Sequence, residues 1–275
     1  MSGRDPIGLA AIGELERRAA ALRRHVVAVA TAQFAHLGGS LSAADLMAGL
    51  FFHFLRFGEG EGPRDHFLLS KGHAVHVLHA CLVERGLLAA EELPGTGTLG
   101  SRLGGHPSLR APGIEFATGS LGHALSVGIG IALGEALARS GSRTVVLLGD
   151  GELQEGTVWE AALCAPRFGL ENLVAIVDQN GFQSGGSVEE ILPVEPLADK
   201  WRAFRWNVLE IDGHDLGAIA GALAAVPARR GPTAILARTV KGKGVPGVEG
   251  TPRAHFTRLS AQESQRALAA LGAAA

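Results

Sequence analysis

The chain has 275 residues, of which 47% are hydrophobic and 19% are charged, enough to build a buried core, so we expect a folded globular protein. The formal net charge is −2, and no block of Lys or Arg stands out. This charge pattern argues against binding to nucleic acid or to an anionic membrane surface. We therefore expect small molecules or other proteins as partners.

The first half of the chain is predicted to be helical. Apolar residues at helical spacing predict helices over residues 12–36, 43–55 and 73–85. Ser42 is a plausible N-cap of the second helix, with Asp45 three residues later. Arg23 and Arg24 before an apolar run faintly imitate a signal peptide, but the polar start and the helical spacing favour an ordinary helix. We expect a cytoplasmic protein.

Residues 116–134 form an uncharged span that is long enough to raise the question of a membrane span. Thr118, Ser120, His123 and several glycines leave too short an apolar core for one. We expect a loop followed by a helix over residues 124–139, whose Ala and Gly content predicts close packing on all sides.

Short β-branched runs then alternate with helices. Strands are predicted over residues 144–148, 173–177, 207–211 and 233–238, and helices over residues 155–168 and 216–226. Pro166 should kink or end the first of these helices. Continuous apolar strands separated by helices predict an α/β fold with a doubly wound, mostly parallel sheet flanked by helices, in which ligands bind beyond the carboxyl ends of the strands.

We expect one domain over residues 1–275, with a short C-terminal helix and an Ala-rich tail over residues 267–275 that frays. Cys81 and Cys164 occur without a CxxC or a zinc-ligand spacing, so both are expected to be reduced and buried.

An acidic residue stands where one predicted strand ends. Asp150 lies between Gly149 and Gly151, and the next strand ends at Asp178-Gln-Asn180. A carboxylate and an amide oxygen suit a hard cation such as Mg²⁺, and the glycines would let a diphosphate approach the backbone. Gly-Asp-Gly alone is more often a tight turn. With Asn180 at the end of the next strand, a metal site is the stronger interpretation.

The segment 149–161, together with Asp178-Gln-Asn180, resembles the thiamine diphosphate signature in its transketolase form. Other blocks extend the resemblance over nearly the whole chain: residues 36–42, 70–74, 105–107, 118–122 and 240–244, the last followed by His255. The resemblance implies thiamine diphosphate as cofactor and Mg²⁺, or Ca²⁺ or Mn²⁺ in its place. It implies that Asp150, Asn180 and the backbone carbonyl of Phe182 bind the metal. The cofactor contacts that it implies are His73, Gly119, Ser120, Leu121, Gly149, Asp150, Gly151, Glu152, Asn180 and His255.

The resemblance also implies catalytic residues. His36, His106 and His255 match the family's active-site histidines, and imidazoles can shuttle protons near neutral pH. Glu155 matches the glutamate at the contact between cofactor sites, although a helix N-cap is its alternative. His123 stands where the family often has Gln, and either touches the cofactor or packs. Leu37 replaces the family's proline, which leaves the aim of His36 open. The other histidines are expected to be loop or capping residues: His25, His53, His66, His76, His79 and His214.

Family members also use a glutamate from a pyrimidine-binding domain. Twenty residues follow His255, too few for such a domain. We therefore expect a separate C-terminal subunit, an α2β2 heterotetramer, and transfer of a two-carbon ketol unit from a ketose to an aldose, both phosphorylated. Two alternatives stay open: the α subunit of a 2-oxoacid dehydrogenase, and a cofactor-binding interaction protein without catalysis.

Overall fold

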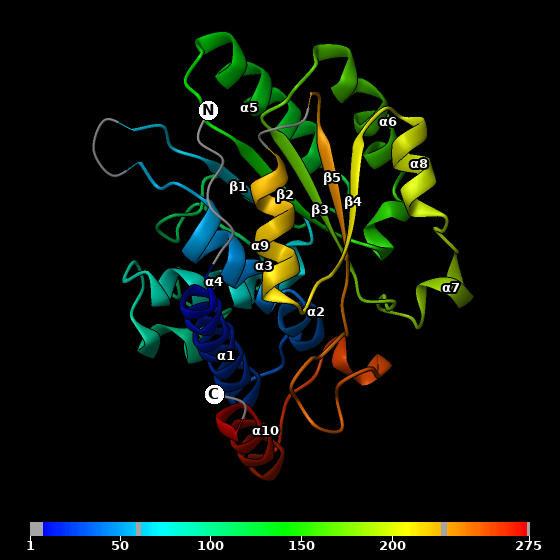
Figure 1. Cartoon of the computed structure of the whole chain (residues 1–275). Coiled ribbons are helices and arrows are strands. Elements are labelled where there is room, and N and C mark those ends of the chain that lie inside the picture. The colour runs from blue at the N-terminus through cyan, green and yellow to red at the C-terminus, as the bar shows by residue number, and fades with distance from the viewer. Residues whose placement is uncertain (1–7, 59–61, 227–229, 274–275) are drawn as a thin grey trace.

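The computed structural model describes residues 8–58, 62–226 and 230–273. Its centre is a sheet with the strand order β1-β2-β3-β5-β4 (Figure 1), and every neighbouring pair runs parallel. The strands are β1 (His66–Leu69), β2 (Thr144–Gly149), β3 (Leu173–Gln179), β4 (Asn207–Asp212) and β5 (Thr233–Arg238). The four predicted strands are confirmed, and β1 is an addition that the sequence did not reveal.

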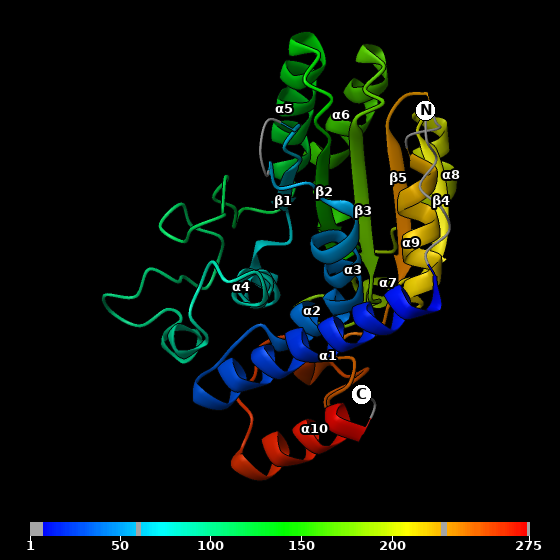
Figure 2. The same cartoon turned by 60° about the vertical axis from the view of Figure 1, so that its left-hand side comes forward.

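Helices cover both faces of the sheet (Figures 1 and 2). One face carries α1 (Leu9–Ala32), α3 (Ala44–Gly49), α4 (Val75–Glu84) and α9 (Leu216–Ala225); the other carries α5 (Ala124–Ala138), α6 (Gly156–Cys164) and α8 (Leu197–Ala203). Along β2, Val145 and Leu147 join the first apolar core, whereas Val146 and Leu148 join the second. Because alternate strand residues point to opposite faces, this division confirms the doubly wound α/β prediction.

The predicted helix 43–55 is interrupted. Its first part is α3, which follows the short helix α2 (Leu37–Ser42) after one residue, and its second part is a π-helical turn, Leu50–Phe54. The prediction of Ser42 as N-cap is wrong: Ala43 occupies that position, and the Ser42 hydroxyl instead donates to the Asp178 carboxylate at 2.6 Å. The predicted helix 73–85 begins as a 3₁₀ turn, Gly72–Ala74, before α4.

The predicted helix 12–36 ends earlier, at Ala32. Ala35 pairs in antiparallel fashion with Thr257, which holds this stretch extended. At the other end of the chain, α10 (Ala261–Ala273) packs on α1 (Figure 2). The expectation that residues from 267 onward fray is wrong as far as Ala273, since Ala267 and Leu271 are buried. Residues 274 and 275 lie outside the described part.

Pro166 acts as predicted, because α6 ends at Cys164 and a 3₁₀ turn, Ala165–Phe168, begins with Pro166 in its first turn. Both cysteines are free thiols. Cys81 is buried as expected, but Cys164 is exposed, so that expectation is wrong. The physical reason is position: Cys164 is the last residue of α6, whereas Val158, Ala161 and Ala162 form the buried side of that helix.

The prediction that the helix after residue 123 packs closely on all sides is also wrong for this chain. Along α5, Gly130 and Gly134 are exposed and Leu137 is 77% exposed. Only one stripe of the helix, including Leu125 and Ile129, enters the core. Within the described residues, no helix is both long and apolar enough to span a bilayer.

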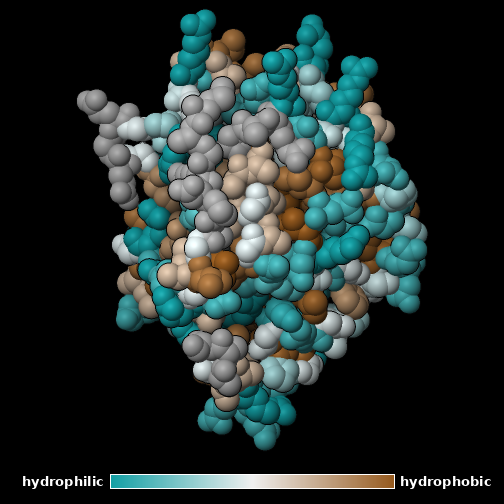
Figure 3. Space-filling model, in the orientation of Figure 1, coloured by the Kyte–Doolittle hydropathy of each residue, from teal (hydrophilic) through white to brown (hydrophobic). Residues whose placement is uncertain are grey.

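The sheet ends in an edge strand at β4. Its apolar residues Val208, Leu209 and Ile211 are only half-buried. Figure 3 shows apolar side chains gathered between α9 and this edge, with hydrophilic residues over most of the same face. This edge is therefore covered less completely than the central strands.

Candidate active site

A cavity of about 170 Å³ lies beyond the carboxyl ends of β2 and β3. Predicted site residues supply most of its lining: Lys71, His73, Gly149, Asp150, Gly151, Glu152, Asn180, Phe182, Gln183, Ser184, Lys241 and His255. Because β2 and β3 are parallel and in register, with Gly149 opposite Asp178, residues that follow both strands reach the same place.

Asp150 is the first residue after β2. One of its carboxylate oxygens accepts from the backbone N–H of Gly151 at 2.8 Å, and the other accepts from the N–H of Gly181 at 2.6 Å. Burial, followed by the negative charge of Asp178, raises the pKa of Asp150 to about 6. These bonds fix the carboxylate at the cavity wall.

Asn180 and Phe182 supply further oxygens. The Asn180 side-chain oxygen accepts from the N–H of Phe182 at 3.1 Å, and Lys241 Nζ donates to the Phe182 carbonyl at 2.9 Å. Burial, followed by the charge of Lys71, lowers the pKa of Lys241 to about 8. Asp150, Asn180 and Phe182 thus line one cavity, as the sequence predicted.

These residues fit a hard cation. Among the described residues, no group of three or more His, Cys, Asp or Glu side chains is arranged to hold a metal, but the predicted set contains one carboxylate, one amide oxygen and one backbone carbonyl. Such oxygen ligands suit Mg²⁺, Ca²⁺ or Mn²⁺. The raised pKa of Asp150 reflects buried negative charge beside Asp178 that a divalent cation would offset.

Two buried lysines were not singled out in the sequence. Lys71 forms an ion pair with Asp178, and Lys241 also lines the cavity. Asp178 accepts further hydrogen bonds from the hydroxyl groups of Ser42 and Thr239. Both lysines stand within blocks that resemble the family, residues 70–74 and 240–244, and this position could have identified them as site residues. Their charges suit an anionic ligand such as a diphosphate.

Glu152 lines the cavity, but its carboxylate is already engaged. It accepts from the N–H of Gly122 at 2.9 Å, from the N–H of Gly149 at 3.0 Å and from the hydroxyl of Ser70. Burial is the largest influence on this carboxyl and raises its pKa. Glu152 thereby ties the end of β2 to the loop 118–122.

The loop 118–122 is fixed close to the cavity. The Thr118 hydroxyl donates to the Leu69 carbonyl at 2.7 Å, and a Cβ placed on Gly119 would lie 3.6 Å from the His106 ring. Ser120 is exposed and Leu121 is half-buried. Just beyond the loop, His123 Nδ1 lies 3.0 Å from the Leu121 carbonyl oxygen, on the surface.

Glu155 lies beside this loop at the start of α6. A Cβ on Gly122, which has φ of +83°, would lie 2.8 Å from the Glu155 Cβ, so only glycine fits there. Glu155 occupies the N-cap position, but its side chain makes no capping hydrogen bond, and the residue is exposed. A capping role therefore does not account for this glutamate.

The four histidines of the family blocks come together. The ring centroid of His36 lies 5.5 Å from that of His73, 6.0 Å from that of His106 and 5.4 Å from that of His255. The centroids of His73 and His255 are 5.7 Å apart. These residues come from four separate segments, so the cluster is a product of the fold.

Two glycines make the cluster possible. A Cβ on Gly39 would lie 3.1 Å from His73 Nε2, and one on Gly38 would lie 2.6 Å from the Ala254 carbonyl oxygen. Leu37, in the place of the family's proline, is buried at the first position of α2, directly after His36. With leucine there, the His36 ring still lies within 6.0 Å of the other three histidine rings.

Burial keeps the imidazoles of the cluster neutral. It is the first cause of lowered pKa values for His36, His73 and His106, and it lowers the pKa of His255 to about 4, with Lys241 as the second cause. Lys241 Nζ lies 3.2 Å from His255 Nδ1. At neutral pH each ring can therefore both donate and accept a hydrogen bond.

His214, which the sequence indicated to be a loop or capping residue, supports the site from behind. Its Nδ1 lies 2.7 Å from the Asp45 carboxylate, and its Nε2 accepts from the N–H of Val240 at 2.8 Å. Asp45 is also bound by Arg23 of α1. This chain of contacts holds the segment that carries Lys241, so His214 is more than a loop residue.

Four other histidines lie outside the cluster. His76 and His79 follow His73 on α4 and are buried; Nδ1 of His76 and both ring nitrogens of His79 have no hydrogen-bond partner among the described residues. His25 pairs with the carboxylate of Glu84, and His66 pairs with those of Glu115 and Glu135. None of these four lines the cavity. The expectation of loop or capping roles is nevertheless wrong for them, because His25 lies within α1, His66 begins β1, and His76 and His79 lie within α4.

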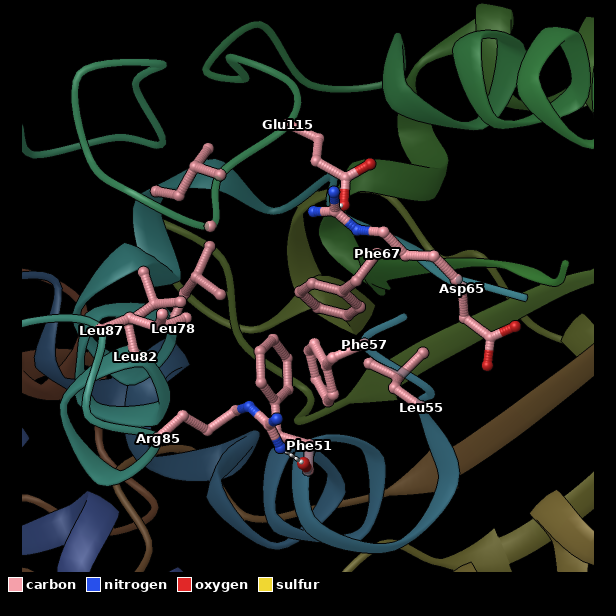
Figure 4. A pocket seen from close by; sticks show the side chains of 13 residues that line it. Phe51, Leu55, Phe57, Asp65, Phe67, Leu78, Leu82, Arg85, Leu87 and Glu115 are labelled. Atoms are coloured by element: carbon pink, nitrogen blue, oxygen red, sulfur yellow. Dashed lines mark hydrogen bonds and ion pairs between the residues drawn. The ribbon is translucent and has the colours of Figure 1, made fainter. Parts of the chain in front are cut away.

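A larger cavity, of about 460 Å³, lies elsewhere (Figure 4). Its walls include Phe51, Phe57 and Phe67, and the Arg85 guanidinium lies 3.6 Å from the Phe57 ring centroid. None of the predicted site residues lines it. The smaller cavity therefore remains the candidate site, because the candidate metal ligands, two lysines and two of the clustered histidines line it.

Fold and cavity together define an α/β protein with a doubly wound parallel sheet and a candidate ligand site beyond the carboxyl ends of its strands. Residues 16–275 match the family described as transketolase, thiamine diphosphate binding domain. The chain belongs to the transketolase family. The resemblance drawn from the sequence blocks is thus confirmed, and with it the class of enzyme, a transketolase-type transferase.

Individual relatives agree with this assignment. The chain is 38% identical to a protein of Phocaeicola vulgatus named as one subunit of an apulose-4-phosphate transketolase, over 90% of this chain and 89% of that one. It is also 38% identical to the 6-deoxy-6-sulfo-D-fructose transketolase subunit SqwG of a Clostridium species, over 86% of this chain and 88% of that one. The transketolase of Pichia stipitis, solved with sedoheptulose 7-phosphate, superimposes with a TM-score of 0.87 at 32% identity. That likeness covers 94% of this chain but only 41% of the Pichia chain.

Proposed function

We propose that this chain is the N-terminal subunit of a two-component transketolase. Together with a separate C-terminal subunit that carries the pyrimidine-binding domain, it would transfer a two-carbon ketol unit from a ketose to an aldose. The observation that carries the proposal is the cluster of His36, His73, His106 and His255 beside the cavity that holds Asp150 and Asn180. Relatives that are themselves named as transketolase subunits match nearly the whole chain, which supports a separate partner.

In this proposal Asp150, Asn180 and the Phe182 carbonyl hold Mg²⁺. Gly149 and Gly151 let the diphosphate approach the backbone closely. Lys71 and Lys241 offset its negative charge, and His73 donates a hydrogen bond to it. The loop residues Gly119, Ser120 and Leu121 lie against the ring system, and Glu152 fixes that loop. Bound thiamine diphosphate supplies an electron sink for cleavage of the bond beside a ketose carbonyl.

The imidazoles of His36, His106 and His255 bind substrate hydroxyl groups and move protons there. Their lowered pKa values keep them neutral, so each can accept a proton from a hydroxyl and return it. The loop carrying His106 is exposed, and His106 is the most accessible ring of the cluster. Glu155, which is exposed beside Gly122, lies at the contact between the two cofactor sites of the assembly.

Uncovered apolar side chains support an assembly. Leu137 of α5, Leu163 of α6 and Phe168 after α6 are each exposed by 46% or more, and α5 and α6 pack side by side. We propose an α2β2 heterotetramer in the cytoplasm, acting on phosphorylated sugars. A 2-oxoacid dehydrogenase subunit is the weaker alternative, because a subunit of that class is not expected to carry the four-histidine cluster.

The test is reconstitution. The chain is mixed with the pyrimidine-domain subunit, thiamine diphosphate and Mg²⁺, and formation of a new ketose from a ketose phosphate and an aldose phosphate is followed by mass spectrometry. Turnover that requires all four components supports the proposal. Cofactor binding without any ketol transfer by the complete mixture would favour the non-catalytic alternative.

A further inference from the structure

Two exposed aromatic rings stand next to the histidine cluster. Phe34 is 61% exposed and Phe256 is 54% exposed, yet their rings stack on each other, with centroids 5.6 Å apart and planes inclined by 22°. Large apolar side chains exposed in contact with each other indicate a surface that meets another molecule.

The backbone holds this pair rigidly. Ala35 and Thr257 exchange two hydrogen bonds, each of 3.0 Å, as an antiparallel bridge. Both of these residues are buried. Side chains alternate along extended backbone, so their neighbours Phe34, His36 and Phe256 point to the opposite, outer side.

The pair borders the proposed substrate position. The Phe256 ring centroid lies 4.8 Å from that of His36, and Phe256 directly follows His255. The two phenylalanine rings thus continue outward from the histidine cluster, with the Phe256 ring beside His36 and the Phe34 ring stacked on it. Arg258, also on this outer side, already donates from Nε to the Thr31 carbonyl at 3.3 Å.

We propose that Phe34 and Phe256 form an apolar wall beside the acceptor position, which favours, over acceptors with more hydroxyl groups, those whose chain beyond the carbonyl carries fewer of them, without excluding phosphorylated aldoses. This inference rests on the proposed ketol transfer. Each methylene group that leaves water for the rings is worth about a fourfold change in an equilibrium constant. A hydroxyl group against the same rings loses hydrogen bonds to water without gaining a partner.

The experiment compares two four-carbon acceptors, butanal and D-erythrose, in the complete complex with its partner subunit. Hydroxypyruvate is the donor: the bond to its carboxylate breaks and CO₂ leaves, while the two remaining carbons form a new bond to the aldehyde carbon and a proton goes to its oxygen. The quantity measured is the ratio of kcat/KM for butanal to that for D-erythrose.

In the doubly substituted variant Phe34→Ser, Phe256→Ser this ratio should fall by about tenfold or more. The variant Phe34→Leu, Phe256→Leu should retain most of the preference. Leu268→Ser, at an exposed position on α10, is the matched control and should leave the ratio unchanged.

The other outcomes are distinct. An unchanged ratio in the double serine variant overturns the wall but leaves the proposed function standing. Loss of assembly with the partner subunit, measured by analytical ultracentrifugation, would mean that the rings belong to the subunit interface, and it overturns the proposal as well. No transfer to either aldehyde by an unaltered complex that does convert phosphorylated sugars overturns the inference and leaves the proposed function standing. No transfer with phosphorylated sugars either contradicts the proposed function, and the inference with it.

Discussion

Lys71 and Asp178 form an ion pair at the end of β3 in which neither side chain is more than 1% exposed to solvent. The Asp178 carboxylate also accepts hydrogen bonds from Ser42, Thr239 and Asn180, so its oxygens are fully engaged. Burying two charges is costly unless each has such partners. The pair therefore joins α2, β3 and the segment after β5 directly behind the candidate site.

Replacing Lys71 with Met should destabilise the fold by about 3 kcal/mol, because it leaves the Asp178 charge buried without its counterion. Urea denaturation followed by circular dichroism measures this loss. Lys243→Met is the control: Lys243 pairs with Glu249 at 3.3 Å, both side chains are partly exposed to solvent, and the substitution should cost less than about 1 kcal/mol. Equal effects of the two substitutions would contradict the importance of the buried pair.

The sequence predicted the sheet well because its strands are apolar on both faces. Short, continuous apolar runs such as Leu173–Gln179 and Thr233–Arg238, separated by helices, are typical of buried strands in a parallel sheet. β1 was missed because it has only four residues and begins with His66. α2 was not predicted, and α3 was predicted only as part of a longer helix over residues 43–55. Ser42, at the boundary between them, bonds to Asp178, and a tertiary contact of this kind cannot be read from the local sequence.

Asp150→Ala or Asn180→Ala should abolish Mg²⁺-dependent binding of thiamine diphosphate while the protein stays folded. Each substitution removes an oxygen from a loop position rather than from a core contact, so the loss of stability should stay within about 1–3 kcal/mol. Isothermal titration calorimetry measures the affinity. Asp199→Ala, at an exposed carboxylate on α8, should bind the cofactor normally. Unchanged affinity in both site variants would remove the metal assignment.

The sequence predicted correctly that Asp150 and Asn180 meet at one cavity, because each stands in a short motif directly after a strand. Lys71 and Lys241 were not singled out, although both stand in recognised blocks. Their role at the site depends on their burial and on partners that are distant in the sequence. His214 was underestimated for the same reason. Its contacts with Asp45 and Val240 exist only once α3 and the segment after β5 are brought together.

His106→Ala should lower kcat by about a hundredfold or more in the reconstituted complex, while the affinity for thiamine diphosphate changes little. His106 belongs to the cluster but does not line the cavity that holds Asp150. His73→Ala, at a residue that lines that cavity, should put a larger share of its effect on cofactor affinity. Near-normal turnover of His106→Ala would show that its catalytic assignment is wrong.

His79 should make the fold sensitive to acid. Burial lowers its pKa to about 4 from an ordinary value of 6.5. Its contribution to stability is fully present above pH 6.5 and is lost as the pH falls from 6.5 toward 4, because the unfolded chain takes up a proton that the folded one does not. Between pH 7 and pH 5 this loss is about 2 kcal/mol. His79→Gln and His79→Leu, which cannot be protonated, should each flatten the measured pH dependence by that amount; an unchanged slope would contradict the prediction.

The last prediction concerns the uncovered face of α5 and α6, which stand side by side in Figures 1 and 2. Leu137 is 77% exposed and Leu163 is 65% exposed, and burying one leucine is worth about 1.5–3 kcal/mol. In a two-fold symmetric assembly a substitution appears in both copies of the interface, so a charge at this position should weaken association strongly. Leu137→Arg should raise the dissociation constant of the assembly by about tenfold or more in analytical ultracentrifugation, and ketol transfer should fall with it. Leu9→Arg, at a still more exposed leucine on α1, controls for the added charge. If both variants assembled equally well, this face would be an ordinary solvent surface, and the active assembly would have to be built through another part of the chain.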